Sequence, residues 1–117
     1  MAIDSCRQSI KDSLSGIAVN DLDKNEINES GIFLLYTGFK PEGGLLYRNF
    51  DLYVAGNSFD ETLAPATLTD IEKKLTKKAL PPRTALKVTE GKLIRFDDDG
   101  FYVFLIKVSY RDDEAWV

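Results

Sequence analysis

The sequence predicts an α+β fold: a mixed or antiparallel sheet of about four to five strands, with two helices packed on one face. Three patterns lead to this prediction. Apolar and polar residues alternate over residues 49–54, the period of a half-buried strand. Over residues 64–79, apolar residues recur at steps of four, three, four and four, which marks one face of a helix. The third pattern is Phe101–Tyr110, the most β-prone stretch of the chain.

The composition is that of one ordinary globular domain, residues 1–117, with a flexible C-terminal tail from about residue 111. The net charge is −4, which disfavours tight binding to nucleic acid because that binding depends on neutralising phosphates. The sequence has no histidine, the commonest general base and metal ligand at neutral pH. Its single cysteine cannot form an intramolecular disulfide, which favours a reducing compartment. No apolar run approaches the roughly 18 residues of a membrane helix.

The first element is an amphipathic helix predicted over residues 2–17. One stripe of this helix holds Ile3, Ile10, Leu14 and Ile17, Cys6 lies beside it, and Gly16 marks the expected stop. Cys6 is therefore interpreted as a small buried hydrophobe and not as a reactive thiol.

A polar, acidic surface loop is predicted next, over residues 20–30. Within it, Asp21, Asp23, Asn25 and Glu26 invite a calcium interpretation because ligands at alternate positions suit that ion. The glycine and the distal glutamate of an EF-hand loop are missing at the required positions. A solvated loop is therefore favoured over a calcium site.

A β-hairpin follows the loop. The apolar run 32–36 predicts a central strand covered on both sides, and residues 45–55 predict its partner. Lys40–Gly44 lies between them and contains a proline and paired glycines, so the hairpin is predicted to have a long polar tip.

The second helix has two alternative starts. Ser58 and Glu61 have the spacing of an N-terminal capping box, but Pro65 would then lie in the second turn and remove a hydrogen bond. Alternatively the helix begins at Pro65, where proline is tolerated. The lysines at the far end, residues 73–78, are interpreted as a solvated face and not as a phosphate-binding patch.

The chain closes with a second hairpin. Residues 84–88 and 92–96 form one strand interrupted at Glu90–Gly91, or two short strands. Asp97–Gly100 is the turn, because Asp-Gly between apolar runs is a strong hairpin signal. The last strand, Phe101–Tyr110, is apolar on both faces, so it is central in the sheet or covered on one face by another subunit. The three aspartates are interpreted as a solvated turn and not as a magnesium site, since neighbouring strand residues point to opposite faces.

The matching apolar faces of strand and helix predict one shared core. Its members are expected to be Phe50, Leu52, Val54, Leu68, Ile71, Leu75, Phe104 and Ile106. No catalytic constellation, glycine-rich phosphate loop or metal-ligand spacing is found, so no catalytic residue, cofactor or metal is expected.

The order of these elements resembles that of the tail terminator, or tail completion, proteins of long-tailed bacteriophages and prophages. The likeness is carried by the helix Ile3–Leu14, the strand IFLLYTG at Ile32–Gly38, the strand and helix start RNFDLYVAGNSFDE at Arg48–Glu61, and the hairpin GKLIRFDDDGFYVFLIKVSY at Gly91–Tyr110. The chain is short for this family.

The resemblance implies a structural role in the virion tail, with assembly in the bacterial host cytoplasm. Such proteins form rings, commonly hexamers, that cap the tail tube and offer a surface to the head–tail connector. A net negative charge suits a channel through which DNA slides without sticking. The implied partners are copies of the chain, the tail tube protein and the connector, with no membrane and no specific nucleic acid.

An assembly surface is predicted on three parts of the chain, because exposed aromatic and apolar residues often anchor protein interfaces. These are the loop tip, the exposed side of the last strand and the C-terminal tail. The residues are Lys40, Pro41, Glu42, Gly43, Gly44, Phe101, Val103, Leu105 and Trp116. Trp116 has a second interpretation, in which it folds back onto its own sheet.

A different functional class stays open. A small intracellular adaptor or immunity-type module would meet a single partner through its sheet. The oligomeric state separates the two hypotheses, because a monomer at high concentration favours the adaptor.

Overall fold

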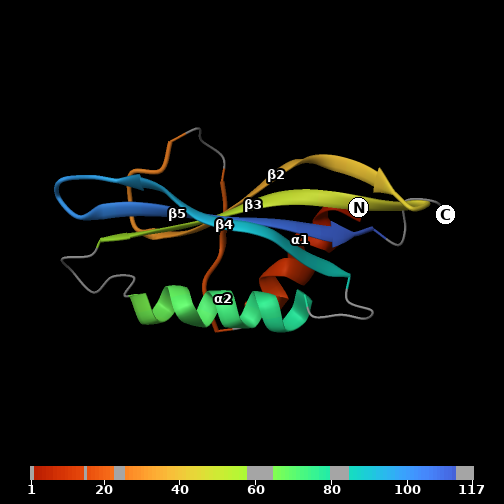
Figure 1. Cartoon of the computed structure of the whole chain (residues 1–117), viewed down its shortest axis with the longest axis horizontal. Coiled ribbons are helices and arrows are strands. Elements are labelled where there is room, and N and C mark those ends of the chain that lie inside the picture. Colours follow the sequence, from red (N-terminus) through yellow and green to blue (C-terminus); the bar gives the residue numbers. More distant parts are fainter. Residues whose placement is uncertain (1, 15, 23–25, 58–64, 80–84, 113–117) are drawn as a thin grey trace.

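A computed structural model of the chain describes residues 2–14, 16–22, 26–57, 65–79 and 85–112. It contains two helices and one five-stranded mixed sheet, which confirms the predicted α+β fold. The strands are β1 (Asn20–Asp21), β2 (Gly31–Glu42), β3 (Leu45–Asn57), β4 (Leu86–Phe96) and β5 (Phe101–Arg111). Their order in the sheet is β1-β2-β3-β5-β4, with β1 parallel to β2 and all other neighbours antiparallel. Both helices lie on the same side of the sheet (Figure 1). Among the described residues, no helix is long and apolar enough to cross a membrane.

The helices bury the stripes that their sequences present. Helix α1 spans Ala2–Ser13 and buries Cys6 and Ile10, with Leu14 just beyond its end. It ends earlier than predicted, before Gly16, whose φ of 85° favours glycine. Helix α2 spans Pro65–Ala79, so the alternative with proline at the first helical position is the one observed. Ser58 and Glu61 lie outside the described residues.

The first hairpin is longer and tighter than predicted. Strand β1 is Asn20–Asp21, β2 is Gly31–Glu42 and β3 is Leu45–Asn57. The predicted tip residues Lys40, Pro41 and Glu42 are strand residues paired with Tyr47, Leu46 and Leu45. The turn is only Gly43 and Gly44, whose φ values of 59° and 80° are those of a two-residue turn suited to twisted strands.

The second hairpin resolves the other open alternative. Strand β4 is a single strand, Leu86–Phe96, and it pairs along its length with β5, Phe101–Arg111. Its register shifts twice, between Val88 and Glu90 and again between Leu93 and Arg95. These bulges explain why the sequence looked interrupted, since each one breaks the alternation of side chains.

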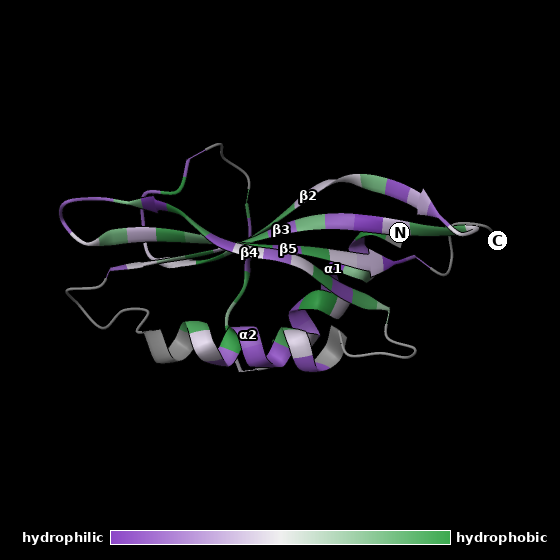
Figure 2. Cartoon of the chain, in the orientation of Figure 1, coloured by the Kyte–Doolittle hydropathy of each residue, from purple (hydrophilic) through white to green (hydrophobic). Residues whose placement is uncertain are grey.

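The predicted core residues lie together in the structure, which confirms the prediction of one shared core. Six of its members are buried and lie in one cluster that also holds Ile10 and Leu14 of the N-terminal segment, while Leu68 and Phe104 are half-buried and pack against the same cluster. The buried six are Phe50, Leu52, Val54, Ile71, Leu75 and Ile106. Figure 2 shows that the half of β5 nearest the 97–100 turn is mainly hydrophobic, as expected for a strand with neighbours on both sides.

Candidate functional site

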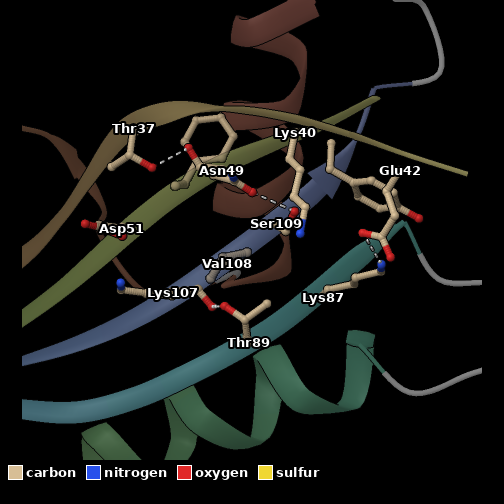
Figure 3. A pocket seen from close by; sticks show the side chains of 12 residues that line it. Thr37, Lys40, Glu42, Asn49, Asp51, Lys87, Thr89, Lys107, Val108 and Ser109 are labelled. Atoms are coloured by element: carbon tan, nitrogen blue, oxygen red, sulfur yellow. Dashed lines mark hydrogen bonds and ion pairs between the residues drawn. The ribbon is translucent and has the colours of Figure 1, made fainter. Parts of the chain in front are cut away.

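The face of the sheet opposite the helices carries a polar groove of about 390 Å³. It arises because Phe50 and Leu52 face the helices, so the alternate residues Asn49 and Asp51 point to the other side. We call this site the polar groove (Figure 3). Its lining side chains come from four neighbouring strands and include Thr37, Lys40, Glu42, Tyr47, Asn49, Asp51, Lys87, Thr89, Lys107 and Ser109.

The hydroxyl groups in the polar groove are engaged by the sheet itself. Ser109, which is only 7% exposed, donates to Asn49 Oδ1 at 2.9 Å. Thr37 donates to the carbonyl of Asn49 at 3.1 Å, and Thr89 donates to the carbonyl of Lys107 at 3.3 Å. These bonds fix the floor of the groove and leave its charged side chains as the groups that can meet a ligand.

The charges in the polar groove are mixed. Lys87 Nζ lies 3.6 Å from Glu42 Oε2 and 4.1 Å from the centre of the Tyr47 ring. Lys107 Nζ lies 4.0 Å from Glu90 Oε2, at the limit of an ion pair. Lys40 makes no ion pair with any described residue.

Asp51 marks the boundary of the polar groove. It accepts a hydrogen bond of 3.2 Å from the Tyr53 hydroxyl. Burial raises the pKa of Tyr53, and the neighbouring Asp51 charge raises it further, because both disfavour the phenolate. Tyr53 therefore stays a neutral donor to Asp51 throughout the neutral range.

Beyond Asp51 the same face of the sheet becomes apolar, and here one expectation was wrong. Phe101, Val103 and Leu105 were predicted to form an exposed assembly face, but they are 9%, 3% and 7% exposed. Phe101 and Val103 form a second buried cluster with Ala55. Ile27, Phe33 and Tyr53 pack against this cluster. A long-range contact from the acidic loop thus covers a face that looked free in the sequence.

The turn between β4 and β5 has the predicted position and a defined structure. We call Asp97–Gly100 the acidic tip. Arg95 Nη2 lies 2.7 Å from Asp97 Oδ2, and its Nη1 donates to the carbonyl of Ile27 at 3.1 Å. The hydrogen bond from Arg95 lowers the pKa of Asp97, and the positive charge of Arg95 lowers it further. Asp99 Oδ1 accepts a bond of 3.0 Å from the Phe101 amide.

An ion pair between Arg48 and Asp112 lies toward the opposite end of the sheet from the acidic tip. Arg48 Nε donates to Asp112 Oδ2 at 2.9 Å, and Arg48 Nη1 donates to the Tyr36 hydroxyl oxygen at 3.0 Å. Asp112 is 3% exposed, and its amide donates to the carbonyl of Leu46 at 2.8 Å. Sequence reasoning missed this pair because its partners are 64 residues apart and neither belongs to a motif. The pair has a structural role, because it ties β3 to the residue that follows β5 and to Tyr36 on β2.

The remaining predicted site residues are distributed as follows. Lys40 and Glu42 line the polar groove, whereas Gly43 and Gly44 form the hairpin turn beside it. Trp116 lies outside the described residues. In the loop with the calcium-like spacing, Asp21 lies 3.1 Å from Lys11 Nζ, and Asp23 and Asn25 are outside the described residues. Across the described ranges, no group of three or more acidic or cysteine side chains is placed to hold a metal ion.

Neither the family models nor the curated proteins with which the sequence was compared gave a match.

Proposed function

We propose that this chain is a structural protein of a phage or prophage tail, which caps the tail tube and helps to join it to the head–tail connector as a ring. One observation carries the proposal. The large apolar side chains exposed on the described part of the molecule gather near the ends of its two long hairpins. Exposed apolar patches of this kind mark surfaces that other proteins cover. They suit a chain that meets two neighbours, one at each end.

Two further features support the proposal. The observed order of a helix, a hairpin, a second helix and a second hairpin agrees with the order that carries the resemblance to tail terminators. The net charge of −4 suits a ring around a DNA channel, since the ring must not bind the phosphates. The proposed sites of action are the host cytoplasm during assembly and then the virion tail. No catalytic role is part of this proposal.

The direct test is growth of the tail tube. Tail tube protein from the phage or prophage that encodes this chain is polymerised with and without the purified chain, and tube lengths are measured by electron microscopy. The expected result is a ring at one tube end and tubes that stop growing. Lys77→Glu, a change at an exposed position of α2 outside both hairpins, is the matched control and should act like the wild type. A chain that neither binds tube ends nor limits their length would contradict the proposal.

The polar groove favours a second candidate, a small intracellular adaptor or immunity-type module. A groove of about 390 Å³ on an open sheet face suits one partner segment. Sedimentation velocity at high protein concentration separates the two functions. An adaptor is expected to stay monomeric and to leave tube growth unchanged.

A further inference from the structure

The ends of the two long hairpins lie at opposite ends of the molecule, whose longest dimension is 48 Å (Figure 1). The acidic tip ends the β4–β5 hairpin. The polar groove lies toward the Gly43–Gly44 turn, which ends the β2–β3 hairpin. A surface at each end permits contact between successive copies in the same orientation, and such contacts close into a ring when the rotation allows.

The charges at the two ends are opposite. Three lysines against Glu42 and Asp51 leave the polar groove with a formal charge of +1. Lys40 is the cation in the groove that has no ion-pair partner among the described residues. At the acidic tip, three aspartates against Arg95 leave a formal charge of −2. Asp98 is exposed, and within the described chain it is not ion-paired.

The acidic tip is ordered before any partner arrives. The Asp97 amide donates to the carbonyl of Phe101 at 2.8 Å, and the Gly100 amide donates to the carbonyl of Asp97 at 2.9 Å. Asn57 Nδ2 also donates to the carbonyl of Asp99 at 3.2 Å. A turn held in this way loses little conformational entropy when it docks, which favours binding.

Apolar side chains accompany both charged sites. Near the groove end, Leu45 is 39% exposed and pairs with Glu42, so it lies on the face that carries the groove. Phe39 is 63% exposed but pairs with Arg48, so it lies on the opposite face. Leu93, Ile94 and Phe96 are 52%, 46% and 60% exposed on the strand that leads to the acidic tip. A contact that joins the two ends would therefore bury apolar surface around a charged centre, which is the usual arrangement of stabilising and specifying groups at an interface.

We propose that the acidic tip of one copy docks in the polar groove of a second copy, head to tail, with Asp98 facing Lys40. This inference rests on the ring of the proposed function and names its contact surfaces. An acidic protein turn suits the polar groove better than a nucleic acid does, because Glu42 and Asp51 would repel a continuous row of phosphates.

A charge swap tests this contact. Sedimentation equilibrium measures self-association of the wild type, Lys40→Glu, Asp98→Lys and the double variant. Each single change places like charges together, so self-association should weaken by about tenfold or more. The double variant restores opposite charges and should recover most of the wild-type association. Lys77→Glu and Asp12→Lys, on exposed helix positions, carry the same charge changes and should have little effect.

The other outcomes overturn the contact. The contact is overturned if the wild type stays monomeric at millimolar concentration. It is also overturned if the single variants self-associate as strongly as the wild type, or if the double variant does not regain self-association. Lys40-dependent binding of a fluorescent DNA duplex would reassign the polar groove to nucleic acid. Circular dichroism confirms that each variant is folded. If tube capping survives both single changes, the contact between tip and groove is overturned and the proposed capping function stands. If association depends on the acidic tip but tubes are not capped, the contact stands and the proposed function is overturned.

Discussion

Ile71 shows how much one core side chain contributes to the stability of the fold. It is fully buried in the cluster that joins α2 to the sheet. Ile71→Ala should lower the free energy of unfolding by about 2 to 5 kcal/mol, because it removes buried methyl groups and leaves a cavity. Urea denaturation measures the loss. Lys77→Ala, an exposed change on the same helix, should shift stability by less than about 0.5 kcal/mol. An unchanged urea midpoint for Ile71→Ala would remove Ile71 from the core.

Asp112 is the second residue whose loss should be costly. Asp112→Ala leaves the Arg48 guanidinium without its carboxylate in a partly buried site. The free energy of unfolding should fall by about 3 to 5 kcal/mol, the usual effect of breaking a buried pair. The double variant Arg48→Met with Asp112→Leu should be more stable than Asp112→Ala, because it leaves no unpaired charge. Thermal melts of the three proteins decide this, and equal melting points for wild type and Asp112→Ala would contradict it.

At the scale of elements, the sequence predicts best where the pattern is local. Alternation identified β3, and the helical period identified α2 with its two alternative starts. The extent of the first hairpin was wrong because Lys40, Pro41 and Glu42 look like turn residues, yet their pairing with β3 continues past a bulge after Tyr36. Bulges and the number of paired residues depend on the partner strand, which no single segment of sequence encodes.

Two glycines on the second hairpin should respond oppositely to alanine. Gly91 has no positive φ, and an added Cβ would lie 3.5 Å from the Phe104 ring, an ordinary contact. Gly91→Ala should therefore raise stability by about 0.4 to 1 kcal/mol by restricting the unfolded chain. Gly100 has a φ of 90°, so Gly100→Ala should destabilise by more than that. Thermal unfolding of the two variants checks the signs, and a lower melting point for Gly91→Ala would contradict the first.

The acidic tip gives a prediction about pH. The hydrogen bond from Arg95 lowers the pKa of Asp97 in the folded chain. A carboxyl group whose pKa is lower in the folded chain stabilises the fold at pH values above its pKa in the unfolded chain, about 3.9. This stabilisation is lost as the pH falls through the pKa of the folded chain. Carbon-detected NMR titration should therefore show Asp97 protonating at lower pH than a free aspartate, and Arg95→Gln should raise its pKa. An Asp97 pKa unaffected by Arg95→Gln would contradict the assignment.

At the scale of the whole molecule, the sequence could not show which faces are covered. β5 is apolar on both faces, and the sequence left open whether this strand is central in the sheet or covered on one face by another subunit. The structure places Ile27, from a polar loop without any pattern, against the cluster that contains Phe101 and Val103. The polar groove is equally invisible in sequence because its lining is collected from four strands. Such long-range placements follow from the topology and not from any local period.

The C-terminal tail supplies the last test of the assembled state. The described core clusters are built from residues up to Tyr110, and Trp116 is an aromatic residue shortly after the charged residues 111–114. Aromatic residues of this kind often dominate the energy of protein interfaces. Deleting Glu114–Val117 should therefore leave the thermal midpoint nearly unchanged while abolishing ring formation or tail joining. Trp116→Ala should reproduce the deletion, and Glu114→Gln, which keeps the tryptophan, should not. A truncated chain that melts several degrees earlier and still assembles would assign Trp116 to the core of its own subunit.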